Sequence, residues 1–176
     1  NGNDKSTDPS TEKAVSIAYI APSITPYQNL NPTFRVYSVH PVTYEIMDYD
    51  QYDATSPSVD DLLECKATLG PVSRKRYSAR EAYGDFHASS QRNTYKAGVE
   101  LDHARWPWNA PLNGTFWAAV TDEMEQRPEL VQTWAEYTSS MSPRAKQCTS
   151  KKCQEAVICY MRSGSTNLGL KCNGDY

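Results

Sequence analysis

The sequence lacks the features that define several large classes of protein. Its 176 residues contain no apolar run approaching the roughly 20 residues that a membrane-spanning helix needs. Positive charge is not in excess, because 18 Lys and Arg stand against 21 Asp and Glu, which gives a net charge of −3. This balance offers no cationic footprint for a nucleic-acid polymer or an anionic membrane. No G-x-S-x-G, P-loop or H-E-x-x-H motif occurs either. We therefore find no complete catalytic constellation in this chain.

Histidine is scarce, and the acidic residues do not form a recognisable metal loop. The three histidines (His40, His87 and His103) are scattered, and only His103 has an acidic neighbour, Asp102. Neighbours in sequence point apart in a strand or a helix, so this pair is weak evidence of a site. The run D-Y-D-Q-Y-D at 48–53 lacks the glycine and the distal glutamate of a calcium hand. We predict ordinary surface or turn histidines, a solvated strand end at 48–53, and no metal ligands in this chain.

The amino-terminal residues show no signal-peptide pattern, because residues 1–13 are polar throughout. We predict that they form a flexible linker or a loop cut open. The length is that of one domain, or of one domain with an appendage. A mean hydropathy of −0.69 is on the polar side for a self-sufficient core.

Cysteine, by contrast, is informative. Cys65 stands alone, and the other four (Cys148, Cys153, Cys159 and Cys172) cluster near the carboxyl end. Zinc knuckles use pairs of C-x2-4-C, and of the gaps of four, five and twelve residues only the first fits. Two local disulfides are therefore favoured over a metal knuckle, which places the protein outside the reducing cytosol. The sequon at Asn113 agrees with a secretory route and makes Asn113 the predicted glycosylation site.

The only long stretch that reads as sheet is 14–52. Period-2 alternation predicts strands at 15–20, 34–39 and 44–49, with a structured excursion at 22–32 and a turn at 40–43. In the middle strand, Phe34, Val36 and Ser38 share one face. Three strands are near the limit of independent stability, so we predict that this sheet belongs to something larger.

Helices follow the sheet. Residues 73–83 are good helix formers, and Gly84 suits a left-handed C′ position. We interpret 55–71 as a loop with one helical turn, and 85–109 as an irregular excursion packed down by Trp106 and Trp108. The later helices are predicted from an apolar stripe at Leu112, Phe116, Ala119, Val120 and Met124, from Pro128 followed by Leu130, Val131, Trp134, Tyr137 and Met141, and from a start near Ser150 followed by Cys153, Ala156, Val157 and Tyr160. Strands first and helices after predict an α+β fold.

Three motifs in this order resemble a known family. The runs A-P-S-I-T-P and N-P-x-F-R-V-Y, with the return strand, resemble the end of the catalytic domain of acid sphingomyelinase and the acid sphingomyelinase-like phosphodiesterases. These enzymes belong to the calcineurin-like metallophosphoesterases. The run Y-S-A-R-E-A-Y at 77–83 resembles the R-A-R-E-T-Y-G helix that follows in them. The terminal cysteines resemble the family's two closing disulfides, which implies the pairs Cys148–Cys153 and Cys159–Cys172 and leaves Cys65 over.

The resemblance implies a fold and a chemistry. It predicts that 14–54 are the last strands of a metallophosphoesterase β-sandwich and that 55–176 form a mostly helical, disulfide-closed subdomain. Two zinc ions in this family activate a hydroxide that attacks phosphorus. Their ligands come from D-x-H, G-D, G-N-H-E and G-H-x-H motifs, none of which is present here. We therefore expect zinc to be bound by a missing N-terminal portion, and this chain to be inactive alone.

Residue roles are implied for two positions. Tyr27 matches a tyrosine that lies near the substrate head group in acid sphingomyelinase, so we predict that Tyr27 binds substrate. Arg35 matches a family arginine that we interpret as structural. The implied reaction converts sphingomyelin to ceramide and phosphocholine, in a secreted or lysosome/vacuole-type setting. Two alternatives stay open: the same chemistry on nucleotides or other phosphodiesters, and a free-standing, disulfide-stabilised secreted binding module.

Overall fold

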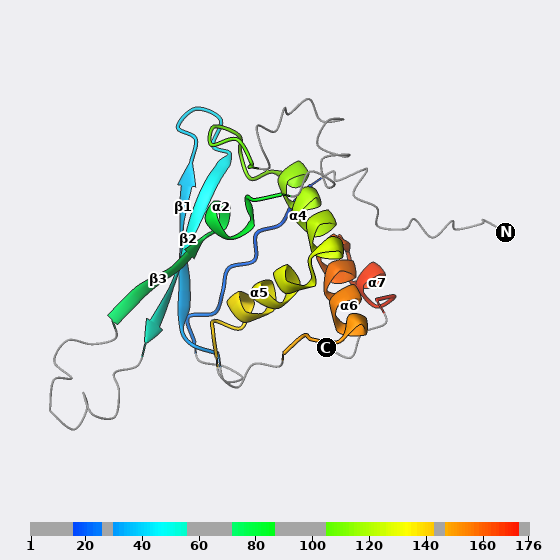
Figure 1. The fold of residues 1–176 in the computed structure, drawn as a ribbon. Helices are drawn as coiled ribbons and strands as arrows, with labels where there is room; N and C mark the ends of the chain where they lie inside the picture. Colours follow the sequence, from blue (N-terminus) through cyan, green and yellow to red (C-terminus); the bar gives the residue numbers. More distant parts are fainter. Residues whose placement is uncertain (1–15, 26–29, 56–71, 87–104, 143–146, 173–176) are drawn as a thin grey trace, which may run out of the picture.

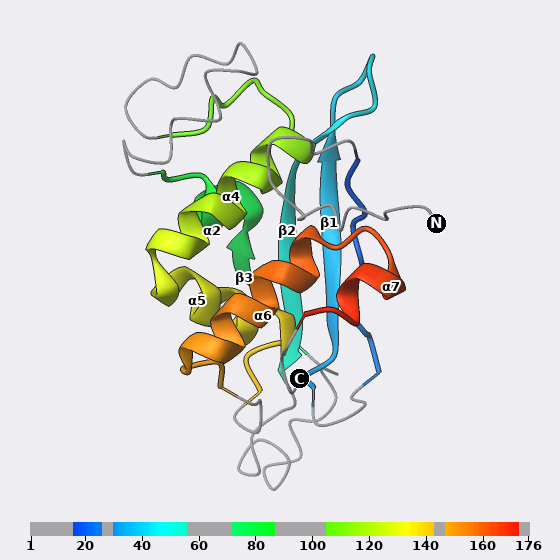
Figure 2. The same cartoon turned by 90° about the vertical axis from the view of Figure 1, so that its right-hand side faces the viewer.

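The protein folds into one sheet with helices on one of its faces (Figures 1 and 2). The computed structural model describes residues 16–25, 30–55, 72–86, 105–142 and 147–172. The sheet is antiparallel with the order β1-β2-β3, from β1 (Thr33–Val39), β2 (Ile46–Thr55) and β3 (Val72–Ser78). The helices are α2 (Ala79–Tyr83), α4 (Gly114–Gln126), α5 (Pro128–Thr138), α6 (Lys151–Arg162) and α7 (Thr166–Gly169). The predicted α+β class is confirmed. The predictions for 1–13, Tyr27, Cys65, His87 and His103, and most of those for 55–71 and 85–109, fall outside the described residues.

The predicted hairpin is present. β1 pairs with β2 in a register that sets Phe34 opposite Tyr52 and Tyr37 opposite Tyr49. Along β1, Thr33 is buried and Arg35 and Tyr37 are half-buried on the side of the helices, while Phe34 and Val36 are exposed on the other face. β2 extends to Thr55, beyond the strand predicted at 44–49. The division at 54/55 remains a prediction, although β3 shows that the sheet also takes residues from beyond it.

The first predicted strand is wrong. Residues 16–22 form no ladder, although they run along the free edge of β1. Side chains hold this segment instead: the Tyr19 hydroxyl donates to the Leu112 carbonyl, and Arg35 Nη1 donates to Ile20 O at 3.0 Å. Period-2 alternation reports which side chains of an extended segment are covered. It does not report whether the backbone has a ladder partner.

The helix predicted at 73–83 is wrong over its first part. Its residues pair with β2 as β3, and only Ala79–Tyr83 are helical, with the Ser78 hydroxyl accepting from Glu81 N at 3.2 Å. Pairing along β2 overrides local helix propensity here. Gly84 has φ −84°, so the left-handed prediction is also wrong. A glycine fits there for another reason, because an added Cβ would lie 2.3 Å from the Arg80 carbonyl oxygen.

The later helices follow the prediction more closely. α5 begins with Pro128 in its first turn, and Ser150 caps α6. The prediction that a side chain packs in the core is wrong for three residues. Met141 lies beyond the end of α5 with φ 54°, Tyr160 is partly exposed, and Trp108 is 83% exposed. The core is mainly aromatic and aliphatic side chains between the sheet and α4–α6, including Tyr49, Tyr77, Tyr83, Trp106, Leu112, Phe116, Val120, Met124, Val131 and Val157.

Two disulfides close the carboxyl-terminal helices. Cys148 is bonded to Cys153 and Cys159 to Cys172, with Cα–Cα distances of 5.5 and 5.7 Å. These are the pairs that the family resemblance implies. The first bridge joins Cys148, which precedes α6, to Cys153 in the first turn of that helix. The second joins Cys159 in α6 to Cys172, just beyond the end of α7. Within the part of the chain that the structure describes, no helix is both long and apolar enough to cross a membrane.

Candidate functional site

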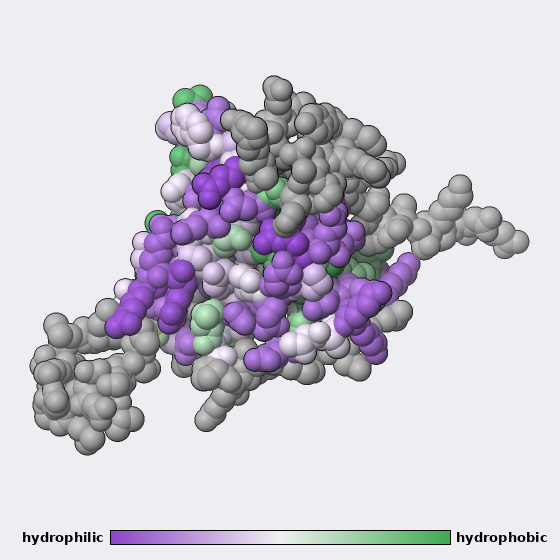
Figure 3. Space-filling view, viewed as in Figure 1, coloured by the Kyte–Doolittle hydropathy of each residue, from purple (hydrophilic) through white to green (hydrophobic). Residues whose placement is uncertain are grey.

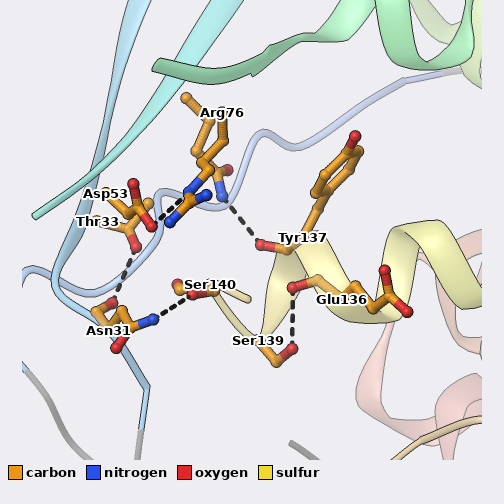
Figure 4. Close-up of polar contacts among 9 residues, drawn as sticks. Asn31, Thr33, Asp53, Arg76, Glu136, Tyr137, Ser139 and Ser140 are labelled. Carbon is orange, nitrogen blue, oxygen red and sulfur yellow. Dashed lines mark hydrogen bonds and ion pairs between the residues drawn. The ribbon is translucent and has the colours of Figure 1, made fainter. Parts of the chain in front are cut away.

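Polar side chains gather where the ends of the strands meet the end of α5 (Figure 4). Thr33, Gln51 and Asp53 are each 1% exposed, which is unusual for such residues unless they are hydrogen-bonded. They come from β1 and β2, and their partners come from β3, α5 and the segment before β1. We call this set the polar junction; its members are Asn31, Thr33, Gln51, Asp53, Arg76, Tyr137 and Ser140.

Two side-chain amides of the junction bind carbonyls at the end of α5. Gln51 Nε2 donates to Tyr137 O at 2.9 Å, and Asn31 Nδ2 donates to Ser140 O at 2.8 Å. The last carbonyls of a helix have no partners within the helix, so these amides satisfy groups that burial would otherwise penalise. Ser140 has φ 55°, a conformation that the chain adopts as it leaves α5. The junction therefore fastens the helical layer to the sheet at the segment that ends the 22–32 excursion.

The charged pair of the junction is Asp53 and Arg76. Arg76 Nε lies 2.5 Å from Asp53 Oδ2. The other carboxylate oxygen, Oδ1, is buried and has no hydrogen-bond partner among the described residues. Because Asp53 is buried and held by the guanidinium, its carboxylate is out of reach of a substrate. Its role is to pair β2 with β3.

The remaining carboxylates of 48–53 are also partnered. Asp48 Oδ1 accepts from Tyr49 N at 2.8 Å and from Arg80 N at 3.1 Å, and Asp50 pairs with Lys75 Nζ at 2.8 Å. The prediction of a solvated strand end is therefore wrong for Asp53. The sequence predicts a helix where β3 lies, so it does not predict that Arg76 of β3 pairs with Asp53. Within the described ranges, no three His, Cys, Asp or Glu side chains are grouped so that they could hold a metal ion.

Arg35 lies beside the junction, in a layer of aromatic rings. Its guanidinium carbon is 4.4 Å from the centroid of the Tyr49 ring, and its Nε donates to Gln51 Oε1 at 2.9 Å. The same oxygen accepts from the Tyr77 hydroxyl at 3.0 Å. Arg35 thus binds an amide, a carbonyl and a ring face, which is the structural role predicted for it.

Burial disfavours the phenolate form of several tyrosines near Arg35. Burial raises the pKa of Tyr49 and of Tyr83, because a phenolate there would lose its hydration, and the neighbouring Tyr77 adds to the effect. Burial also raises the pKa of Tyr19, against a hydrogen bond from Trp117 that lowers it. These phenols stay neutral at physiological pH, so the rings serve packing and hydrogen bonding.

The structure describes some of the predicted site residues and not others. Tyr27 lies outside the described residues, but the two ends of its excursion meet where Thr33 N donates to Ser23 O at 3.0 Å. Asn113 is the exposed N-cap of α4, and its Oδ1 accepts from Phe116 N at 3.2 Å. This leaves Nδ2, the atom that would carry a glycan, free of the cap; glycosylation stays a prediction. His40 is a turn residue, as predicted, with Nδ1 accepting from Thr43 N at 3.1 Å.

Sequence reasoning missed the polar junction. Asn31 lies in the N-P-x-F-R-V-Y run, but its partner Ser140 is 109 residues away. Arg76 was assigned to a helix, so its pairing with Asp53 across two strands was hidden. A useful signal was available in the pattern of β2, where Gln51 and Asp53 occupy the helix-facing positions of a buried strand.

Comparison with known proteins finds similarity to sphingomyelin phosphodiesterases. Sphingomyelin phosphodiesterase 1 of Caenorhabditis elegans is 28% identical over 163 residues, covering 92% of this chain and 23% of the relative. Sphingomyelin phosphodiesterase A of Dictyostelium discoideum is 28% identical over 156 residues, covering 89% of this chain and 21% of the relative. No family model and no solved structure matches the chain. The chain spans less than a quarter of the length of these relatives. Over about nine-tenths of its own length, this chain is similar to these two sphingomyelin phosphodiesterases.

Proposed function

We propose that this chain forms the C-terminal part of a zinc-dependent phosphodiesterase that hydrolyses sphingomyelin to ceramide and phosphocholine. The observation that carries the proposal is the similarity of about nine-tenths of the chain to two sphingomyelin phosphodiesterases. In this proposal the sheet completes a metallophosphoesterase sandwich, and the helical layer packs against it. The two disulfides fit an oxidising setting, either secreted or of the lysosome/vacuole type.

The exposed face of the sheet supports a role within a larger fold. Phe34 stacks on Tyr52 with ring centroids 5.2 Å apart, and Val36 beside them is 53% exposed. The described helices all lie on the opposite face (Figures 1 and 2). Exposed Phe34 and Val36 on this face, and a β1 edge with no ladder partner among the described residues, are features that packing against further strands would bury.

The described residues do not fit a zinc pair. The described carboxylates of β2 are partnered by Lys75, Arg76 or backbone N–H groups, and His40 uses its Nδ1 within its own turn. Zinc prefers imidazole, thiolate and carboxylate ligands that converge on one point. In the proposed enzyme the metal ligands come from the motifs of an N-terminal portion, and this chain supplies Tyr27 for the choline head group.

The test is direct. The transcript upstream of Asn1 should encode the D-x-H, G-D, G-N-H-E and G-H-x-H motifs, and the longer protein should hydrolyse sphingomyelin in a chelator-sensitive way. The 176-residue chain alone should be inactive. Robust, chelator-sensitive hydrolysis by the chain alone, or an upstream reading frame without these motifs, would contradict the proposal. Comparing sphingomyelin with nucleotide phosphodiesters as substrates separates the proposed function from its nearest alternative.

A further inference from the structure

The entrance to the 22–32 excursion is tied to the end of α5 through two side chains. Arg35 Nη1 donates to Ile20 O at 3.0 Å, just before the excursion, and Arg35 Nε donates to Gln51 Oε1 at 2.9 Å. Gln51 continues this chain of hydrogen bonds, because its Nε2 donates to Tyr137 O at 2.9 Å. The Gln51 side chain is buried, so water does not compete for these bonds.

The exit of the excursion is tied to the end of α5 directly. Asn31 Nδ2 donates to Ser140 O at 2.8 Å (Figure 4). The Thr33 hydroxyl donates back to Asn31 O at 2.9 Å, and Thr33 N donates to Ser23 O at 3.0 Å. The described ends of the excursion are therefore bonded to each other and, by two separate routes, to the segment 137–140.

The chain leaves α5 in a conformation that is unfavourable for its residues. Ser140 and Met141 have φ 55° and 54°, in the left-handed region that glycine adopts freely. Two such residues in succession carry a conformational cost that the surrounding contacts must offset. Backbone outliers of this kind are concentrated at functional positions. Here the outlier sets the direction of the Ser140 carbonyl, which is the acceptor for Asn31.

These contacts lie on the inner side of the helical layer. Figure 3 shows a mainly hydrophilic surface over the helices, and the outer side of α5 carries polar pairs such as Gln132 with Glu136 at 3.0 Å. Every group that ties the excursion to α5 belongs to this chain. The connection can therefore be measured in the 176-residue protein.

We propose that the end of α5 is a positioning element for the excursion, and that Asn31 is its positioning residue. Asn31 lies four positions after Tyr27, so a fixed Asn31 limits where the Tyr27 ring can lie. The consequence for catalysis rests on the proposed function, in which Tyr27 binds the choline head group. Asn31 does not touch the head group and acts through Tyr27. The helical layer thereby acquires a role in substrate binding.

The first test follows hydrogen exchange at the Thr33 amide, which donates to Ser23 O, in the 176-residue chain. Asn31→Ala should speed this exchange about fivefold, the factor that corresponds to one lost hydrogen bond. Asn31→Asp keeps the shape and loses the donor, so it should have the same effect. Ser150→Ala is the matched control, because it removes a side-chain acceptor at the N-cap of α6 and should leave Thr33 exchange unchanged.

The exchange measurement can overturn the inference by itself. Unchanged exchange at Thr33 in both Asn31 variants would show that Asn31 does not hold the excursion. If the amides throughout β2 exchange faster by the same factor as Thr33, Asn31 stabilises the whole fold and positions nothing.

The second test is a double-mutant cycle in the proposed longer enzyme. Asn31→Ala should lower kcat/KM for sphingomyelin about threefold to tenfold and leave hydrolysis of a substrate without choline nearly unchanged. Added to Tyr27→Ala it should cause no further loss, because Asn31 acts through Tyr27. Losses that multiply in the double variant, or equal losses on both substrates, would contradict the inference. A longer protein that does not hydrolyse sphingomyelin would count against the proposed function alone, since Thr33 exchange decides separately whether Asn31 holds the excursion.

Discussion

At the scale of single residues, Gly84 shows how a close backbone approach fixes an amino acid. Gly84→Ala would place a Cβ 2.3 Å from the Arg80 carbonyl oxygen, at the end of α2, where the backbone cannot yield cheaply. We expect Gly84→Ala to lower the free energy of unfolding by about 1–3 kcal/mol. Denaturant unfolding of Gly84→Ala, of its control variant and of the unchanged chain measures this loss of stability.

The matched control is Gly164→Ala, because nothing lies within 4 Å of a Cβ built at Gly164. That change should be neutral, or stabilise by about 0.4–1 kcal/mol through a less flexible unfolded chain. Equal effects at the two glycines would show that the contact with Arg80 does not determine the residue at 84.

Tyr27 is the residue on which the proposed substrate contact depends. In the proposed longer enzyme, Tyr27→Ala should lower kcat/KM for sphingomyelin about three- to thirty-fold, the equivalent of a cation–π contact of roughly 0.5–2 kcal/mol. Tyr27→Phe should cost little, because the ring face and not the hydroxyl makes the contact. Hydrolysis of a substrate without choline should be nearly unchanged. An equal loss on both substrates with a lower Tm would instead make Tyr27 a packing residue.

At the scale of elements, one arginine joins α6 to α4. Arg162 Nε donates to Thr121 Oγ1 at 3.0 Å, Nη2 pairs with Asp122 at 2.9 Å, and Nη1 pairs with Glu125. The arginine side chain is only 16% exposed, so solvent screens these contacts weakly. We expect Arg162→Met to lower the free energy of unfolding by about 2 kcal/mol, since it also leaves Asp122 partly buried without this partner.

Lys151→Met is the control for Arg162→Met. It removes an i,i+4 pair with Glu155 whose side chains are 88 and 65% exposed. A pair so exposed contributes little, so stability should change by no more than about 0.5 kcal/mol. If both substitutions cost the same in urea unfolding, the Arg162 contacts do not hold α4 and α6 together.

Elements differed in how far the sequence predicted them. The hairpin and helices α4–α6 were predictable because each carries its own period, cap or proline. β3 was not, because the residues of 73–78 are also good helix formers, and its strand state depends on pairing with β2. Without β3 the polar junction could not be predicted either, because Asp53 and Arg76 meet only when β3 lies beside β2. The prediction that Trp108 packs against the core was wrong because composition does not show whether a tryptophan ring is buried or exposed to solvent.

At the scale of the whole molecule, the open question is what covers the outward face of the sheet. Val36 is 53% exposed on that face and lies opposite Asp50 on β2. In the 176-residue chain, Val36→Lys should change the free energy of unfolding by no more than about 0.5 kcal/mol, because lysine stays hydrated and faces a carboxylate. In the proposed longer protein the same lysine would be buried under further strands, and we expect a loss of about 3 kcal/mol or more.

Comparing Val36→Lys in the 176-residue chain and in the proposed longer protein decides whether the outward face of the sheet is covered. Thermal melts should show a Val36→Lys Tm near that of the unchanged 176-residue chain, and a Tm several degrees lower in the longer protein, together with loss of sphingomyelin hydrolysis. Leu170→Lys, at another exposed apolar side chain, should leave both proteins unaffected. If Val36→Lys is equally harmless in both, the outward face stays in solvent, and the sheet does not complete a sandwich. The similarity to the two sphingomyelin phosphodiesterases would then still hold, but the sheet would be a separate unit beside the proposed catalytic domain.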